Sequence, residues 1–390
     1  MAQLIVIVDK LNKRKSIPAD FSDKTSIIGV VNRGFQFEGT QVQDVPNAAS
    51  GNWFQDRDGS FYWGSGLTLV SPDSLPEAAP LGDQEGSVQQ TSFPWFDNLK
   101  IPSIWSQYNT MGEGAIVAVL DTGYNINNND LSPAVIGVVN LDGSTPRISN
   151  ADTKSPLIND SAGHGTFCAS IIGNTNSKEY KVGIAPKCGL LVAKISNDMG
   201  LDPTGLEVIL NGIAWAIQSN ADIISVSFGK YLYEMPKDPD YLMRMQNRFA
   251  ELVKGKNILI FASCGDNLTE EVSKIDRYPA SLEGCISVGA TDNGQLSSIT
   301  VLSDKTIIHA QGIGVEAYYR TDDPEAKSGT SMSTPIVAGV VALAVSYLKN
   351  RNNGAWDASD LKQKLFDTGD PIPGYPNKKM LNPVKFFEQL

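Results

Sequence analysis

The amino-acid sequence predicts an α/β fold, in which a parallel sheet carries helices on both faces and is preceded by a small all-β domain. Beyond about residue 95, apolar runs of strand length alternate with segments of helical spacing. Residues 1–70 instead hold short strand-like segments without a helical period. A chain of 390 residues with 41% hydrophobic content is long enough to build one large core and one small one.

The strands of the larger region are predicted near residues 115–120, 190–195, 222–228, 257–263 and 285–290. Between them, apolar residues recur at helical spacing in two segments, 206–217 and 242–253. Strands that alternate with helices predict a parallel sheet whose two faces are both covered. We interpret the helical stripes as core, because the sequence shows no phosphate-binding glycine loop that would indicate a cofactor site.

The clearest signal in the first 70 residues is the segment 53–63, where two aromatic runs flank an Asp-Gly pair that favours a tight hairpin turn. Residues 71–94 are rich in proline, glycine, serine and acidic residues, which is typical of a linker. The predicted domains are therefore a small β-barrel over 1–70, a linker over 71–94 and the α/β domain over 95–390. The barrel resembles bacterial SH3-type modules. Its aromatic residues either bind a peptide, a glycan or a partner protein, or form its core.

A hydroxyl-rich segment, 328–335, precedes the most apolar helix that the sequence predicts. Residues 336–345 are apolar on every face, which indicates a helix buried all round. Pro335 is expected in the first turn of this helix, where its missing N–H costs nothing. A serine at such an N-terminus lies beside unpaired backbone N–H groups that can stabilise an oxyanion. Ser331 is therefore the candidate nucleophile, although a plain helix cap gives the same pattern.

A serine nucleophile needs a base that takes its proton and a carboxylate that orients the base. Of the two histidines, His164 lies between two glycines and ahead of an apolar stretch. Asp121 follows the apolar run 115–120, at the carboxyl end of a predicted buried strand, where open parallel sheets place their sites. The predicted triad is Asp121, His164 and Ser331, and His309 is assigned a role in the core or at the surface.

Three motifs in this order resemble those of the subtilisin-like serine proteases, the subtilases. The motifs are VLDTG at 119–123, GHGT at 163–166 and GTSMSTP at 329–335. The segments 183–186, 223–229 and 278–280 agree as well. The resemblance covers about residues 95–390 and implies a subtilisin-like fold that hydrolyses peptide bonds through an acyl-enzyme. Many secreted members carry an inhibitory pro-segment with amphipathic helices, and none is predicted before residue 70, so a linker is the preferred interpretation of 71–94.

The resemblance also implies which residues bind the substrate. The strand 225–229 would pair with an extended substrate peptide, and the segment 262–265 would line the pocket for the side chain that precedes the scissile bond. The assigned residues are Ser225, Ser227, Gly229, Ser263 and Gly265. We expect the pocket for the side chain before the scissile bond to accept an uncharged or apolar side chain.

Asp266 departs from the family pattern, which usually has an asparagine whose amide donates to the oxyanion. An ionised carboxylate there would repel the developing charge, and loss of the donor costs about 2.7–4 kcal/mol of transition-state stabilisation. Two interpretations remain. Either Asp266 carries a proton and donates it, so that activity falls as the pH rises, or the enzyme is slow and selective.

The mechanism requires no cofactor, and no metal ligand is assigned. By resemblance, Asp130 matches a position that ligates structural calcium in many subtilases, and the loop 174–179 would add oxygen ligands, although its lysine makes it less suitable. Structural calcium is therefore an open expectation. The cysteines lack the paired spacing of a zinc site and are expected to be free thiols. They are Cys168, Cys188, Cys264 and Cys285.

The net charge of −11 argues against nucleic acid or an anionic membrane as the main partner. The apolar run near the N-terminus is too short for a signal peptide, and no stretch is expected to be long enough to span a bilayer. We therefore expect a cytoplasmic protein that acts on protein or peptide substrates. A secreted or periplasmic protein whose signal had been removed would have the same sequence.

The leading prediction is a serine endopeptidase. A peptide-binding scaffold with a weakened protease domain is one alternative, suggested by Asp266 and the N-terminal module. A peptide ligase or cyclase of the same fold is another. Covalent labelling by a fluorophosphonate separates the enzyme from the scaffold, and joined rather than hydrolysed products identify a ligase.

Overall fold

The computed structural model describes residues 93–141, 152–175, 182–196, 205–266, 276–319 and 324–390, together with strands and a few adjoining residues before residue 70. The chain divides into two compact units, Met1–Val88 and Gln89–Leu390. The division falls within the predicted linker 71–94, almost all of which lies outside the described residues.

The described elements of the first unit are strands that pair antiparallel in the order β3-β2-β6-β5-β4-β1-β7. The strands are β1 Ala2–Val6, β2 Lys10–Arg14, β3 Ile27–Asn32, β4 Gln36–Gln41, β5 Trp53–Asp56, β6 Phe61–Trp63 and β7 Leu67–Leu69. The predicted aromatic hairpin is confirmed in its pairing, since Trp53 lies opposite Trp63. Its Asp-Gly turn lies outside the described residues, and the likeness to SH3 modules stays a prediction.

The second unit is built on a sheet with the strand order β20-β21-β17-β15-β13-β11-β8-β10-β9. From β21 to β9 the neighbouring strands are parallel, and β20 is antiparallel to β21. The strands are β8 Ile116–Asp121, β9 Val135–Asn140, β10 Gly189–Lys194, β11 Ile223–Val226, β13 Leu259–Ser263, β15 Ile286–Asp292, β17 Thr306–Gln311, β20 Asp370–Ile372 and β21 Tyr375–Met380. The five predicted strands are confirmed to within a few residues.

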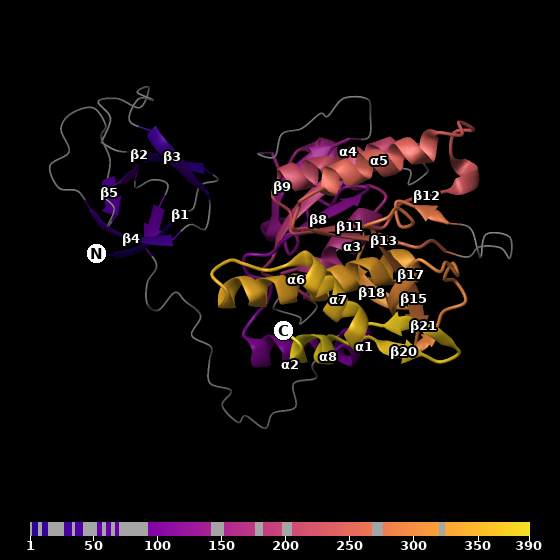
Figure 1. Ribbon diagram of the computed structural model, residues 1–390. Helices are drawn as coiled ribbons and strands as arrows, with labels where there is room; N and C mark the ends of the chain where they lie inside the picture. Colours follow the sequence, from indigo (N-terminus) through magenta and orange to yellow (C-terminus); the bar gives the residue numbers. More distant parts are fainter. Residues whose placement is uncertain are drawn as a thin grey trace. The chain divides into compact units, whose positions relative to one another are not determined.

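Helices cover both faces of this sheet (Figure 1). On one face lie α3 (His164–Gly173) and α6 (Thr330–Arg351), and on the other α4 (Leu206–Gln218) and α5 (Tyr241–Val253). Along β8, Val117 and Val119 belong to the first core, and Ala118 and Leu120 to the second. Because successive side chains of a strand point to opposite faces, a strand buried on both faces is apolar throughout.

Shorter elements complete the second unit. They are the helices α1 Pro94–Asn98, α2 Ile101–Tyr108, α7 Ala358–Thr368 and α8 Pro383–Glu388, and the strands β12 Lys230–Tyr231, β14 Arg277–Tyr278, β16 Gln295–Leu296, β18 Val315–Tyr318 and β19 Pro324–Lys327. Of these, β12 and β14 form an antiparallel pair beyond the carboxyl ends of β11 and β13.

Helix α6 begins five residues before Pro335, so the prediction that this proline lies in the first turn is wrong. Pro335 has no N–H to donate to the carbonyl of Ser331, four residues earlier. That carbonyl instead accepts a hydrogen bond from Ser227 Oγ at 2.8 Å and a longer one from Cys168 Sγ at 3.6 Å. Because Pro335 cannot donate to this carbonyl, the first turn of α6 is hydrogen-bonded instead to the segment that follows β11 and to α3.

The expectation that no stretch is long enough to span a bilayer also needs correction. Helix α6 is long and apolar enough by length and composition, but 89% of its most apolar window is buried inside the fold. The buried helix packs on β11, β13, β15 and β17, as a core helix does.

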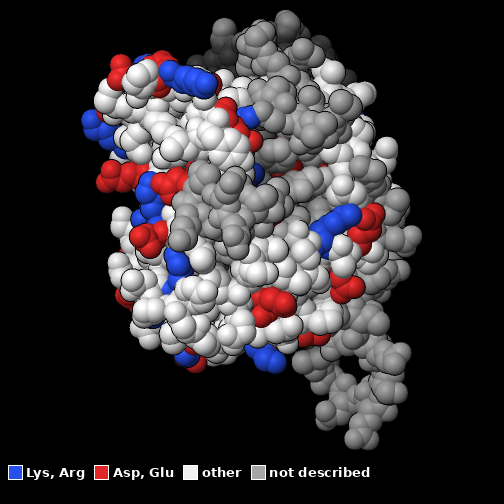
Figure 2. All heavy atoms as spheres, turned by 90° about the vertical axis from the view of Figure 1, so that its right-hand side faces the viewer, with Lys and Arg blue, Asp and Glu red and all other residues white. Residues whose placement is uncertain are grey.

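Charges of both signs are interspersed among uncharged residues on the face drawn in Figure 2. The described residues of this face form no continuous basic surface of the kind that binds nucleic acid. A mixed surface with a net charge of −11 favours solubility.

Candidate active site

Asp121 is the last residue of β8, which lies at the centre of the sheet between β10 and β11. Its side chain is fully buried, and its Oδ1 accepts a hydrogen bond from His164 Nδ1 at 2.8 Å and another from the Thr122 N–H at 2.8 Å. His164 is the first residue of α3 and is 29% exposed. The structure thus brings two of the three predicted triad residues into direct contact.

The surroundings of His164 favour its charged form. Burial opposes that form, but the adjacent Asp121 carboxylate outweighs burial and raises the pKa of His164 well above its usual value. The Cys168 sulfur lies 3.9 Å from His164 Nδ1, and burial raises the pKa of this thiol, so it stays protonated. Phe228 packs edge-on against the imidazole with 5.4 Å between ring centroids. The ring is therefore held by a carboxylate, a thiol and an aromatic side chain.

Asp160 is a buried carboxylate that the sequence reasoning missed. It accepts hydrogen bonds from the Gly163 N–H at 2.7 Å, from the Thr166 N–H and hydroxyl at 2.8 Å each, and from the Thr122 hydroxyl at 2.8 Å. These donors belong to the first turn of α3 and to the residue after Asp121. Asp160 therefore fixes His164 and Asp121 relative to each other. An aspartate four residues before the histidine was the available signal.

Replacing Asp160 with alanine is expected to lower the free energy of unfolding by roughly 1–3 kcal/mol, because buried N–H groups lose their acceptor. It should also reduce kcat, since the histidine turn loses its anchor. Denaturant unfolding measures the first effect and peptide cleavage the second. Asp152→Ala is the control, because Asp152 is exposed. Equal stability of the two variants would contradict the anchoring role.

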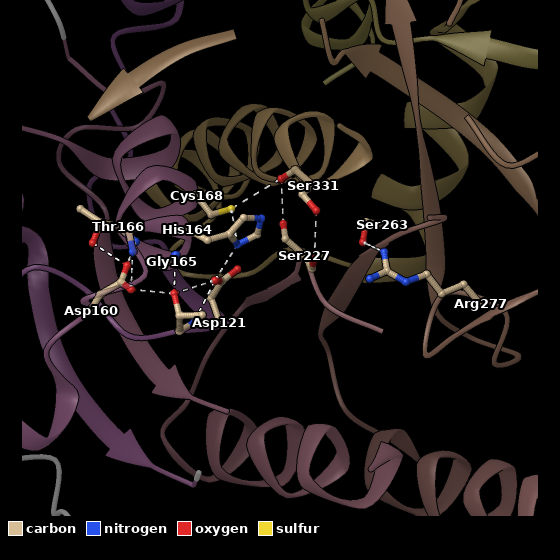
Figure 3. A network of polar contacts seen from close by, with 12 residues as sticks. Asp121, Asp160, His164, Gly165, Thr166, Cys168, Ser227, Ser263, Arg277 and Ser331 are labelled. Carbon is tan, nitrogen blue, oxygen red and sulfur yellow. Dashed lines mark hydrogen bonds and ion pairs between the residues drawn. The ribbon is translucent and has the colours of Figure 1, made fainter. Parts of the chain in front are cut away.

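Ser331 lies in the first turn of α6, across from His164. Its Oγ donates a hydrogen bond to the Ser227 carbonyl at 3.0 Å and none to His164. In Figure 3 the His164 ring lies between Asp121 and Ser331, with one nitrogen toward the carboxylate. The hydroxyl is thus turned toward the segment after β11. A rotation of the Ser331 side chain is needed to bring it to the imidazole.

Four of the five predicted substrate-binding residues lie at or just beyond the carboxyl ends of two adjacent strands. β11 and β13 run parallel with Val226 opposite Ala262, so the residues that follow, Ser227 and Ser263, are neighbours. Gly229 and Gly265 continue the two segments. Ser225 lies inside β11, where its buried Oγ has no hydrogen-bond partner among the described residues.

Asp266 lies beside the first turn of α6. Its Oδ1 accepts hydrogen bonds from the Thr330 N–H at 2.8 Å and the Thr330 hydroxyl at 2.9 Å. Its Oδ2 faces Gly329, the residue before Thr330, since a Cβ added to this glycine would lie 3.0 Å from that oxygen. The structure therefore places this carboxylate beside Thr330, the residue that precedes Ser331 in α6.

The comparison with known proteins agrees with this geometry. A profile of the "Subtilase family" matches residues 112–382. The chain belongs to the subtilase family. Similar proteins include the "Intracellular serine protease" of Paenibacillus polymyxa, which is 31% identical over 274 residues and covers 69% of this chain and 76% of the relative. The "Major intracellular serine protease" of Bacillus subtilis is 31% identical over 255 residues, which are 64% of this chain and 73% of the relative. The present chain is a subtilisin-like serine protease.

Solved structures show the same fold. The prenylagaramide maturation protease PagA superposes with a TM-score of 0.60 at 25% identity, covering 74% of this subtilase and 97% of PagA. A mutant of the protease domain of PatA gives 0.57 at 26% identity, covering 71% of this chain and 94% of that domain. The residues matched by the family profile, 112–382, all lie in the second unit.

Two further predicted residues of this subtilase, His309 and Asp130, are bonded to groups outside the predicted triad. His309 is buried in β17 and bonded to two backbone carbonyls, and burial lowers its pKa to about 4, so it is a neutral core residue. The carbonyl of Asp130 accepts hydrogen bonds from Thr175. The loop proposed to add calcium ligands lies largely outside the described residues. The predicted calcium site stays a prediction.

Metal-ligating side chains gather at one place in the described part of the chain. Asp121, His164 and Cys168 offer ligand atoms within 4.8 Å of one another. Because a proton between the carboxylate and the imidazole accounts for that contact, we assign this cluster to acid–base chemistry. The four cysteines are free thiols, three of them buried.

Proposed function

We propose that this subtilase is a serine endopeptidase in which Ser331 attacks the peptide carbonyl and forms an acyl-enzyme. The observation that carries the proposal is the 2.8 Å bond between a buried Asp121 and His164, with Ser331 at the adjoining helix start. His164 accepts the serine proton, returns it to the leaving amine and then activates water. Asp121 orients the ring and stabilises the imidazolium.

The hydroxyl of Ser331 has to leave the Ser227 carbonyl before it reacts. Rotation about the Cα–Cβ bond moves Oγ from that carbonyl toward the free nitrogen of His164. Catalytic hydrogen bonds are often absent or long without substrate and tighten in the complex. An extended substrate that pairs with the segment after β11 would bring its carbonyl to the same place.

The proposed oxyanion site combines the Ser331 N–H with Asp266. N–H groups in the first turn of a helix have no carbonyl of their own helix to accept them, so the Ser331 N–H is suited to an oxyanion. Asp266 contributes a donor only when Oδ2 carries a proton, because Oδ1 already accepts two hydrogen bonds from Thr330. An ionised Asp266 would slow the reaction. The hydrogen bonds from Thr330 to Oδ1 are kept whether or not Oδ2 carries a proton.

Activity is expected to rise with pH through the raised pKa of His164, because the base must be neutral before it can accept the serine proton. Asp121→Asn should move this rise to lower pH and reduce kcat by about 10⁴-fold, by analogy with other Ser-His-Asp enzymes. The pH profile of kcat/KM measures both effects. An unchanged midpoint in the variant would show that Asp121 does not act on this histidine.

The raised pKa of His164 also predicts how the free energy of unfolding depends on pH. The Asp121–His164 pair is strongest with the imidazole charged, so its contribution is complete below the unfolded-state pKa of about 6.5. It is lost as the pH rises through the higher pKa of the folded protein.

The names of the relatives support a substrate class and a location. Two curated relatives are named intracellular serine proteases, and the similar PagA is named a maturation protease. We therefore extend the proposal to an enzyme that cleaves proteins or peptide precursors in the cytoplasm. For the N-terminal unit two roles stay open: its aromatic residues bind a peptide, a glycan or a partner protein, or they form its core.

Incubation with a diverse peptide library at several pH values, followed by mass spectrometry, tests the function. Hydrolysed fragments that require Ser331 support the endopeptidase. Joined or cyclic products would identify a ligase instead. Neither product, together with no fluorophosphonate labelling from pH 4 to 9, would indicate a scaffold.

A further inference from the structure

We propose that Arg277 makes this protease selective for an acidic side chain, aspartate or glutamate, immediately before the scissile bond. The proposal rests on the proposed endopeptidase function, because it assigns a specificity to the same site. It is carried by the position of one arginine between the two strand ends that the substrate is expected to contact.

Arg277 belongs to β14 and lies opposite Tyr231 of β12. Its side chain runs between Gly229, which follows β11, and Gly265, which follows β13. A Cβ on Gly229 would lie 3.0 Å from Arg277 Nε, and one on Gly265 would lie 2.8 Å from Arg277 Cδ. The two glycines therefore provide the space that the arginine side chain occupies.

The guanidinium end points toward the predicted pocket. Nη1 donates to Ser263 Oγ at 2.9 Å, and Figure 3 shows the side chain extended toward this serine. Ser263 ends β13 beside the segment that leads from β11 to Ser227, and the Ser227 carbonyl accepts the hydroxyl of Ser331 at 3.0 Å. Ser227 and Ser263 thus connect Ser331 to Arg277 along one side of the predicted pocket.

The positive charge of Arg277 has no carboxylate partner among the described residues. Its contacts are neutral: the Ser263 hydroxyl and the Tyr231 ring, whose centroid is 5.6 Å from the guanidinium carbon. Its Nε is buried without an acceptor in the described part of the chain. A half-buried guanidinium with a single hydrogen bond is ready to bind an anion.

Among the described residues, the carboxylates on the segments around Arg277 have partners of their own. Asp266 accepts from Thr330, and Glu234 accepts from the backbone N–H of Tyr231. Asp276 accepts from the Ser303 hydroxyl and pairs with Lys305. The carboxylate that neutralises Arg277 is therefore expected to come from the substrate.

An arginine suits this task because its planar fork of donors matches a carboxylate. A substrate glutamine leaves the charge without a counterion, and a substrate lysine is repelled by it. The inferred preference differs from the uncharged or apolar side chain expected from the sequence.

Fluorogenic peptides that differ only in Glu, Gln or Lys before the cleaved bond test the inference on the full chain. The wild-type kcat/KM should be about 10- to 100-fold higher for Glu than for Gln, and lowest for Lys. Arg277→Gln should remove this difference chiefly by slowing Glu cleavage, and Arg277→Lys should retain part of it. Arg277→Glu should favour the Lys peptide.

Lys305→Gln is the matched control, since it removes a nearby cation that is bound to Asp276 rather than directed at the pocket. This variant should keep the preference for Glu. Fluorophosphonate labelling of Ser331 reports whether each variant retains an active site. Wild-type enzyme that labels normally but does not prefer the acidic peptide overturns the specificity alone, and this result needs no variant. Wild-type enzyme that neither labels nor cleaves overturns the endopeptidase function as well.

Discussion

Ser331→Ala is expected to lower kcat by about 10⁶-fold, by analogy with the type enzyme of the family. The variant loses the attacking oxygen and therefore cannot form the acyl-enzyme. The remaining activity should reflect the oxyanion donors and substrate binding alone. Cleavage of a fluorogenic peptide, measured at saturating substrate, gives the ratio.

Ser328→Ala is the matched control. Ser328 precedes the same helix, and its exposed hydroxyl accepts a hydrogen bond from the Gly314 N–H. The control should retain wild-type kcat. His164→Ala and the double variant with Ser331→Ala should be about as slow as Ser331→Ala, because residues that act as one unit do not lose activity additively. If the kcat losses of the two single variants instead multiplied in the double variant, His164 and Ser331 would have independent roles.

Asp266→Asn is expected to raise kcat by about 10²- to 10³-fold at alkaline pH, where a carboxylate is least able to donate. The asparagine oxygen can keep accepting from Thr330, and its amide supplies a permanent donor to the oxyanion. Steady-state kinetics from pH 5 to 10 measure the effect.

Asp292→Asn makes the same chemical change at the end of β15 and should leave the rate unaltered. An Asp266→Asn enzyme with an unchanged rate and pH profile would remove Asp266 from the oxyanion site. The carboxylate would then serve only as the acceptor for Thr330 at the start of α6.

The sequence was sufficient to predict the central strands and the contact between Asp121 and His164. Strand β8 is buried on both faces, so its continuous apolar run located both the strand and the aspartate at its end. The resemblance of the three motifs to those of the subtilases then assigned His164 and Ser331 as the partners of this aspartate.

Contacts between distant segments could not be predicted in the same way. The spacing of Asp160 from His164 marks it only as a candidate, and its anchoring role follows from the four hydrogen bonds that converge on it. Arg277 is placed beside the predicted pocket only by the pairing of β14 with β12. The start of α6 was misplaced because its first turn is made by the hydroxyl-rich segment, and the carbonyl freed by Pro335 is bonded by Ser227. The hydroxyl orientation of Ser331 likewise depends on that neighbouring segment.

The central claim is that His164 activates Ser331. Labelling with a fluorophosphonate and mapping the adduct by peptide mass spectrometry test it most directly. The account predicts one phosphonylated residue, Ser331, whose labelling rate rises as His164 loses its proton and collapses in His164→Ala. An adduct on another residue, or labelling of Ser331 at the same rate without His164, would contradict the account.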